Sequence, residues 1–276
     1  MSAPSHTGRT AVIGGQGPLP MLVVAALRAA GETPVLAELE GFPVAGAESE
    51  TPERFRFERL VPFLDRLHDL GVARIVFAGG ARRPRLEPEL FDPRSAQLVS
   101  ALLPRMRGGD DAALRAVIAV FEDHGFAVVG AHEVARNLLP PPGVLGAVQP
   151  GEPDLADIER AAEIAHALGS VDVGQGAVVA GGLCLAVEAL PGTDAMLAQV
   201  AAMGRDRRQG VLYKAPKPGQ DLRVDLPAIG PDTIAGAARA GLAGLAFPAG
   251  SVFLFHREAA VAAADAAGLF LFSRPS

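Results

Sequence analysis

The chain has 276 residues, of which 49% are hydrophobic, and its 25 Lys and Arg residues against 31 Asp and Glu residues give a formal net charge of −6. This length suits one large or two medium domains with a substantial buried core. The acidic balance, the single tyrosine and the absence of tryptophan argue against nucleic acid as a partner, because there is neither a basic stripe nor an aromatic platform for bases. The single cysteine permits no intrachain disulfide, which favours a reducing cytosol.

Two further absences in the sequence support a cytoplasmic location. No window approaches the roughly 20 unbroken apolar residues that a membrane-spanning helix needs. The first ten residues, MSAPSHTGRT, have no apolar segment of the kind that a secretory signal carries.

The first half of the chain alternates between expected strands and expected helices. Its strands are continuous apolar runs, which is typical of a parallel sheet covered on both faces. Glycines follow the helices and end them. The expected strands are 10–13, 34–39, 74–78 and 126–130, and the expected helices are 19–30, 58–70 and 111–124.

The second half has a different pattern, with an expected hairpin across Gly181-Gly182 followed by further strands and helices. The expected helices are 154–168, 193–203 and 233–240, and the expected strands are 178–180, 183–190, 210–215, 242–247, 252–255 and 269–272. We therefore predict an α/β fold of two domains. These are an N-terminal Rossmann-like parallel sheet (1–137), a Pro/Gly-rich linker (138–153) and a C-terminal α/β domain with a mixed sheet (154–276).

Glycine turns in the first half are candidates for ligand binding. The turn GGQGP, which contains Gly15 and Gln16, lies between the first strand and the first helix, where backbone amides can approach a phosphate. Its spacing matches neither the dinucleotide fingerprint nor the phosphate-binding loop, and a plain tight turn is an equal alternative. Gly79 and Gly80 end another strand, and the arginine cluster 82–85 follows at once.

The segment 214–225, KAPKPGQDLRVD, concentrates charge in an otherwise apolar region and predicts a site for chemistry. Asp221, Arg223 and Asp225 alternate with apolar residues, which predicts a strand with one charged face. Two carboxylates beside cations suit a Mg²⁺-dependent site that acts on a diphosphate. The alternative is an exposed ladder of ion pairs.

Other polar residues stand out by their surroundings. Glu188 is the one charged residue in an apolar strand, so it must pair with a cation such as Lys214 or Lys217, or help to hold a metal ion. Thr193 opens a helix, where it can cap the helix or help to aim its end at a phosphate. Gln175 lies among glycines and is a candidate for a hydrogen bond to a ligand. Asp110-Asp111 opens another helix, and capping is its favoured role.

Several of these segments resemble those of the LpxI family, the UDP-2,3-diacylglucosamine pyrophosphatases of lipid A biosynthesis. They are DVGQ (172–175), AVEALPGTDAML (186–197), KPGQDLRVDLPAIGPDT (217–233), GGQGPLP near the start and GDDAALRAVI (109–118). The resemblance spans nearly the whole chain, and the block 217–233 is its most specific part. Gly219 departs from the Asn that is common in that family.

The resemblance implies a two-domain cytosolic enzyme that binds its substrate between the domains and uses Mg²⁺. It would hydrolyse the diphosphate of UDP-2,3-diacylglucosamine to UMP and 2,3-diacylglucosamine 1-phosphate (lipid X), with water attacking the phosphorus on the sugar side. The essential aspartate of the family's QDxRxDxP motif falls on Asp225. A lipid substrate also implies transient contact with the cytosolic face of the inner membrane. The sequence leaves open whether the chain forms a homo-oligomer.

From the residues and the resemblance together, we predict the site as follows. Asp225, Asp221 and Arg223 are the predicted catalytic residues, and Asp225 and Glu188 are the predicted Mg²⁺ ligands, with Asp225 as metal ligand or general base. The predicted substrate-binding residues are Gly15, Gln16, Gly79, Gly80, Gln175, Glu188, Thr193, Lys214 and Lys217. We expect the acyl chains in an apolar groove near 138–145 and 247–255.

Three other functions stay open at this point. A nicotinamide- or flavin-linked oxidoreductase would use the Rossmann-like half, although the glycine spacing opposes it. A non-catalytic protein that binds nucleotide sugars and a general nucleotide-sugar diphosphatase are the other two. Assays of dinucleotide binding and of UMP release distinguish them.

Overall fold

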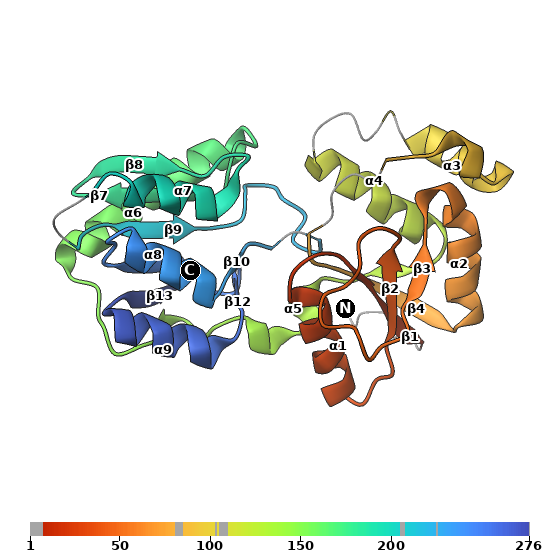
Figure 1. Cartoon of the computed structure of the whole chain (residues 1–276), viewed down its shortest axis with the longest axis horizontal. Coiled ribbons are helices and arrows are strands. Elements are labelled where there is room, and N and C mark those ends of the chain that lie inside the picture. The colour runs from red at the N-terminus through yellow and green to blue at the C-terminus, as the bar shows by residue number, and fades with distance from the viewer. Residues whose placement is uncertain are drawn as a thin grey trace, which may run out of the picture. The chain divides into compact units, whose positions relative to one another are not determined.

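The computed structural model describes residues 8–80, 85–102, 104, 110–204, 208–224 and 226–275, without the side chains of Asp110 and Asp111. The chain forms two units (Figure 1). The N-terminal unit comprises the residues up to Arg136 together with Asp221–Val224, and the C-terminal unit comprises Asn137–Gln220 and the chain after Val224. The predicted motif therefore contributes four residues to the N-terminal unit, although the flanking chain belongs to the other one.

A five-stranded parallel sheet forms the centre of the N-terminal unit, as predicted. Its strands are β1 (Arg9–Gly14), β2 (Val35–Leu39), β3 (Glu53–Phe55), β4 (Val72–Ala78) and β5 (Ala127–Val128). Their order is β3-β2-β1-β4-β5, and all neighbours pair in parallel. The order reverses between β1 and β4, and in open α/β sheets such a reversal marks the crevice where ligands bind.

Helices cover both faces of this sheet. They are α1 (Leu19–Ala29), α2 (Leu60–Asp69), α3 (Pro93–Leu102), α4 (Asp110–Asp123) and α5 (Ala131–Val134), with the short 3₁₀ turns η1 (Phe57–Arg59), η2 (Pro88–Leu90) and η4 (Arg136–Leu138). On one face, Leu64 of α2 and Phe121 of α4 pack on Ala11 and Ile75. Successive strand residues point to opposite faces. Buried Val12 therefore faces the other side, where α1 contacts β1 and β4.

The C-terminal unit is built on a six-stranded mixed sheet, also as predicted. Its strands are β6 (Gly143–Val144), β7 (Gly176–Ala180), β8 (Leu183–Val187), β9 (Val211–Lys214), β11 (Gly244–Pro248) and β13 (Phe270–Arg274), in the order β6-β13-β11-β9-β7-β8. The three central strands β9, β11 and β13 are parallel, and the others join antiparallel. The same unit has a separate two-stranded parallel sheet, in which β10 (Ala228–Ile229) pairs with β12 (Phe253–Leu254).

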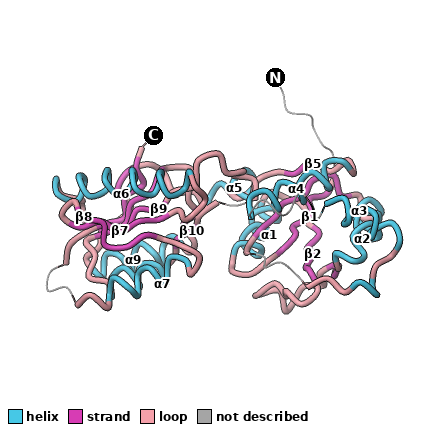
Figure 2. The backbone as a smooth tube through the Cα atoms, turned by 90° about the horizontal axis from the view of Figure 1, so that it is seen from above, coloured by secondary structure: helices cyan, strands magenta, loops and turns pink. Residues whose placement is uncertain are grey.

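One long helix covers one face of this sheet, and three helices cover the other (Figure 2). They are α6 (Glu152–Ser170) on the first face, and α7 (Gly192–Ala201), α8 (Pro231–Arg239) and α9 (Arg257–Ala267) on the second. Ile158 of α6 packs with Val179 and Phe270, whereas Leu197 of α7 and Ile234 of α8 pack in the opposite core. Helix α6 begins two residues before the predicted start, because Gly151 is the N-cap and Asp154 accepts its N–H at 2.9 Å.

Part of the predicted linker is a strand of the C-terminal sheet. Residues Gly143–Val144 pair antiparallel with β13, and the N–H of Leu145 donates to the carbonyl of Leu271 at 2.9 Å. Three prolines, 140–142, directly precede the strand, and proline has no N–H for a sheet ladder.

Candidate functional site

The glycine turns of the N-terminal unit lie together where the strand order reverses, but their amides bond to each other. The N–H of Gln16 donates to the carbonyl of Gly80 at 2.7 Å, the N–H of Gly80 donates to the carbonyl of Gln16 at 3.1 Å, and the N–H of Gly15 donates to Ala78 at 2.7 Å. A Cβ on Gly15 would overlap the carbonyl oxygen of Gly80, and one on Gly79 would lie 2.5 Å from that of Gln16. These glycines therefore allow two loops to approach closely. Their role in substrate binding stays a prediction.

The predicted strand over 221–226 is wrong, because the segment Asp221–Val224 forms a turn. The N–H of Val224 donates to the carbonyl of Asp221 at 3.2 Å, and the N–H of Arg223 donates to the Asp221 carboxylate at 3.1 Å. This is the turn that an aspartate makes when its side chain accepts the N–H two residues on. The period-two alternation of the sequence imitates a strand, but the local hydrogen bonds of Asp221 prevail.

Asp221 and Arg223 form a close ion pair that continues to helix α4. The guanidinium of Arg223 donates to Asp221 at 2.7 and 3.0 Å and to Glu122 at 2.7 Å. These hydrogen bonds from Arg223 hold the pKa of the Asp221 carboxyl below its ordinary value and raise that of the guanidinium. The side chain of Val224 packs against the N-terminal core. Both charged residues thus have structural partners, and their predicted catalytic role stays untested.

Some predicted residues lie outside the described part of the chain. They are Asp225, Arg82 and Arg83, and the side chains of Asp110 and Asp111. The described chain stops at Val224 before Asp225. The turn that ends at Val224 belongs to the N-terminal unit through the contacts of Arg223 and Val224.

Polar residues of the C-terminal unit come together at the ends of β9 and β8. Lys214 is the last residue of β9, Glu188 follows β8, and Thr193 lies in the first turn of α7. The ammonium of Lys214 donates to the Thr193 hydroxyl at 2.7 Å and lies 4.0 Å from the Glu188 carboxylate. Both charged side chains are only 10% exposed. Of the alternatives that the sequence left open for Glu188, a cation is present, and it is Lys214 rather than Lys217.

Two acceptor oxygens of the C-terminal unit have no hydrogen-bond partner among the described residues. They are Oε2 of Glu188 and Oε1 of Gln175, and both are buried. Glycines make room for the carboxylate: a Cβ on Gly176 would lie 2.7 Å from Glu188 Oε2, and one on Gly174 would overlap the Glu188 carbonyl. Because buried acceptors are normally bonded, these two oxygens point to a missing donor.

Lys217 makes its hydrogen bonds to residues outside this cluster. Its ammonium donates to Asp172 at 2.6 Å, and its backbone N–H donates to the Gln220 side chain at 2.9 Å. Gly219, in the same turn, has φ +74°, a conformation that glycine adopts freely and asparagine tolerates better than most residues. This explains how Gly and Asn can replace each other at that position without altering the turn.

A metal site made of protein ligands alone is not present in the described residues. No group of three or more His, Cys, Asp or Glu side chains lies together there. Asp221 has its carboxylate bonded to Arg223, and Glu188 has a cation beside it. The predicted metal role of Glu188 thus stays a prediction.

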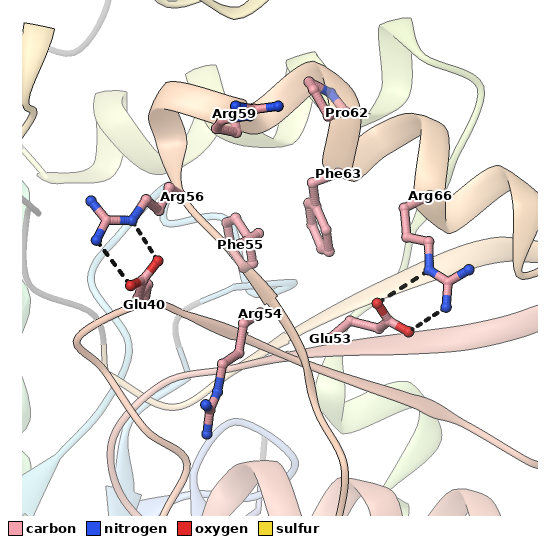
Figure 3. Close-up of a pocket in the computed structure, with 9 residues that line it drawn as sticks. All are labelled: Glu40, Glu53, Arg54, Phe55, Arg56, Arg59, Pro62, Phe63 and Arg66. Atoms are coloured by element: carbon pink, nitrogen blue, oxygen red, sulfur yellow. Dashed lines mark hydrogen bonds and ion pairs between the residues drawn. The ribbon is translucent and has the colours of Figure 1, made fainter. Parts of the chain in front are cut away.

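A pocket of about 350 Å³ lies in the N-terminal unit, and none of the predicted site residues lines it (Figure 3). Phe55 and Phe63 stack there with ring centroids 4.1 Å apart. Arg66 bonds to Glu53 at 2.9 Å, and Arg56 bonds to Glu40. Arg54 pairs with Glu38, so ion pairs engage three of the four arginines that line the pocket.

The prediction that apolar side chains near 247–255 line a groove for the acyl chains is wrong for four of them, because they are buried. Phe247, Val252, Phe253 and Leu254 are at most 1% exposed. Three of them, Phe247, Val252 and Leu254, belong to the core between the mixed sheet and helices α7 to α9. Their apolar character therefore serves packing.

Fold and site together define a two-unit α/β protein with a parallel N-terminal sheet, a mixed C-terminal sheet and a buried Lys-Glu cluster at strand ends. The LpxI N-terminal domain model matches residues 9–138 and the LpxI C-terminal domain model matches residues 141–272, so the chain belongs to the LpxI family. One relative is the UDP-2,3-diacylglucosamine pyrophosphatase LpxI of Caulobacter vibrioides. It is 42% identical over 266 residues, which cover 94% of this chain and 95% of the relative.

In the described parts of the chain, no helix has the length and apolar character needed to span a membrane.

Proposed function

We propose that the protein hydrolyses the diphosphate of UDP-2,3-diacylglucosamine to UMP and 2,3-diacylglucosamine 1-phosphate (lipid X) in lipid A biosynthesis. The observation that carries this proposal is the 42% identity to a pyrophosphatase of that name over 94% of the chain. The two family models, over residues 9–138 and 141–272, extend through both units and span every predicted site residue. A shared fold alone would not support an activity, because one fold can serve many functions.

In the proposed reaction, water adds to the phosphorus on the sugar side, and the bond from that phosphorus to the bridging oxygen breaks. The bridging oxygen leaves with UMP, and the oxygen of water stays on the sugar phosphate. The attacking water must lose a proton, and we assign that role, or the binding of the metal ion, to Asp225. The resemblance to the family's QDxRxDxP motif, whose essential aspartate falls on Asp225, supports this assignment.

Mg²⁺ is the proposed cofactor, and it would neutralise charge on the diphosphate. Mg²⁺ commonly binds phosphate oxygens, waters and only one or two carboxylates, so a site without three protein ligands is no obstacle. Glu188 fits this role poorly, since the ammonium of Lys214 is 4.0 Å from its carboxylate. Asp225 is therefore our candidate for the protein ligand.

The substrate sets the proposed location. The protein would work in the cytoplasm and take its lipid substrate at the cytosolic face of the inner membrane, by transient contact. No nucleic acid takes part, in keeping with the net charge of −6.

The experiment that tests the proposal measures UMP release from UDP-2,3-diacylglucosamine and from UDP-N-acetylglucosamine, each with Mg²⁺ and with excess chelator. We expect a kcat/KM for the lipid substrate that is at least 100-fold higher, because each buried methylene contributes ~0.8 kcal/mol of transfer free energy. Chelation should abolish turnover. Comparable values for the two substrates would indicate a general nucleotide-sugar diphosphatase, and binding without turnover would indicate a binding protein.

A further inference from the structure

The Lys214–Glu188 pair has a gap between its charged ends. Their closest atoms are 4.0 Å apart, which exceeds the 2.7–3.2 Å of a hydrogen bond. Among the described residues, the ammonium of Lys214 hydrogen-bonds only to Thr193, although it has three N–H donors. Oε2 of Glu188 is buried and has no hydrogen-bond partner in the same part of the chain. A donor and an acceptor with unused hydrogen-bonding capacity therefore lie side by side, and an oxygen placed to one side of the pair can bond to both.

The ammonium of Lys214 and the carboxylate of Glu188 determine which ligand group can bond to both of them. A phosphate oxygen can accept from Lys214, but it has no proton for Glu188 and adds a second negative charge. A divalent cation can bind Glu188, but it meets the positive charge of Lys214 at short range. A hydroxyl accepts from the ammonium and donates to the carboxylate, so it satisfies both ends at once.

We propose that Glu188 and Lys214 form a subsite that hydrogen-bonds to a hydroxyl group of the nucleotide-sugar substrate, and that it binds neither the metal ion nor the diphosphate. The inference rests on the proposed function, which supplies a substrate with two sources of hydroxyls. One is the ribose diol, and the other is the pair of free hydroxyls on the glucosamine ring. Such a subsite discriminates strongly, because a substrate that lacks the hydroxyl leaves buried polar groups unpaired.

The test compares kcat/KM of the wild-type protein for the parent substrate and for four analogues. Two lack the 2′- or the 3′-hydroxyl of ribose, and two lack the 4- or the 6-hydroxyl of glucosamine, so the losses identify the source. We expect a loss of about 10-fold to 100-fold for at least one analogue, the range for a hydrogen bond to a charged group. If the wild type had equal kcat/KM values for all five compounds, the proposed subsite would be refuted before any variant is measured.

Glu188→Gln then assigns the loss to this cluster. The variant should turn over the parent substrate more slowly but show little further loss for the sensitive analogue, because both changes remove the same interaction. Glu163→Gln, on the exposed face of α6, is the matched control and should discriminate as the wild type does.

Two outcomes of the variant assays would contradict the proposal. The first is a Glu188→Gln protein, folded by circular dichroism, that keeps the full wild-type discrimination against every analogue. The second is a tenfold rise in the Mg²⁺ concentration for half-maximal activity of that variant, which would make Glu188 a metal ligand. A wild-type protein that releases no UMP from the parent substrate would overturn the proposed function instead, and the subsite with it.

Discussion

The guanidinium of Arg223 lies 2.7 Å from the carboxylate of Glu122, although 101 residues separate them in the chain. Glu122 is near the end of α4, and Arg223 also holds Asp221 through two of its nitrogens. Together with the packing of Val224, these contacts make the turn a part of the N-terminal unit. The residue that the family resemblance makes essential, Asp225, follows this turn directly.

Arg223→Lys should lower kcat by at least 10-fold with little change in KM. Lysine cannot replace the planar fork that bonds to Asp221 and Glu122 simultaneously, so the turn before Asp225 would lose its fixed position. Glu122→Gln should cost only a few-fold, because a partly exposed pair contributes ~0.2–1 kcal/mol. Steady-state kinetics with a parallel melting curve measures both. Arg160→Lys, at an exposed ion pair of α6, is the control, and an Arg223→Lys protein with wild-type kcat would refute the positioning role.

Asp221→Asn should destabilise the protein in a way that depends on pH. Arg223 lowers the folded-state pKa of Asp221 below its value in the unfolded chain, which is ~3.9. The ion pair therefore contributes its full stabilisation above that pH and loses it as the pH falls through the folded-state pKa. Urea unfolding followed by circular dichroism should show a constant difference from wild type between about pH 7 and 5 and a shrinking one below about 4. A difference that stays unchanged at the lowest pH would contradict this account.

Gly15→Ala should destabilise the N-terminal unit, because its Cβ would overlap the carbonyl oxygen of Gly80. Overpacking of this kind costs about 1–3 kcal/mol, which a drop in melting temperature measures. Gly80→Ala is a close control at the same contact: its Cβ would meet nothing within 4 Å, and its φ is not positive. Equal melting temperatures for the two variants would mean that the loops can separate without cost.

The sequence predicts most of the fold, because continuous apolar runs indicate buried strands and glycines indicate where helices end. The parallel sheet, the hairpin β7–β8 and the mixed C-terminal sheet all follow from these signals. It does not predict β3, α3 or α9. β3 is only three residues long. α9 is rich in alanine and lacks the large apolar side chains that mark the buried face of a helix in a sequence.

The site is harder to predict, because its contacts are long-range. That Glu188 needs a partner was predictable, since it is a lone charge in an apolar strand, but the sequence did not choose between Lys214, Lys217 and a metal ion. The turn at Asp221 was not, because alternating charge indicates a strand unless an aspartate bonds to the backbone nearby. Nothing in the sequence indicates that Arg223 meets Glu122, which depends on how the chain folds back.

The central claim is that the protein cleaves the diphosphate of UDP-2,3-diacylglucosamine and depends on Asp225 to do so. The most direct test counts UMP and 2,3-diacylglucosamine 1-phosphate released by the wild type and by Asp225→Asn with Mg²⁺, alongside substrate binding by calorimetry. The account predicts equal amounts of the two products from the wild type. It also predicts a kcat at least ~100-fold lower for the variant, with binding retained, because a catalytic base or metal ligand is lost while the uridine and acyl contacts remain. Wild-type protein that releases neither product, or a variant that keeps more than about a tenth of wild-type kcat, would contradict it.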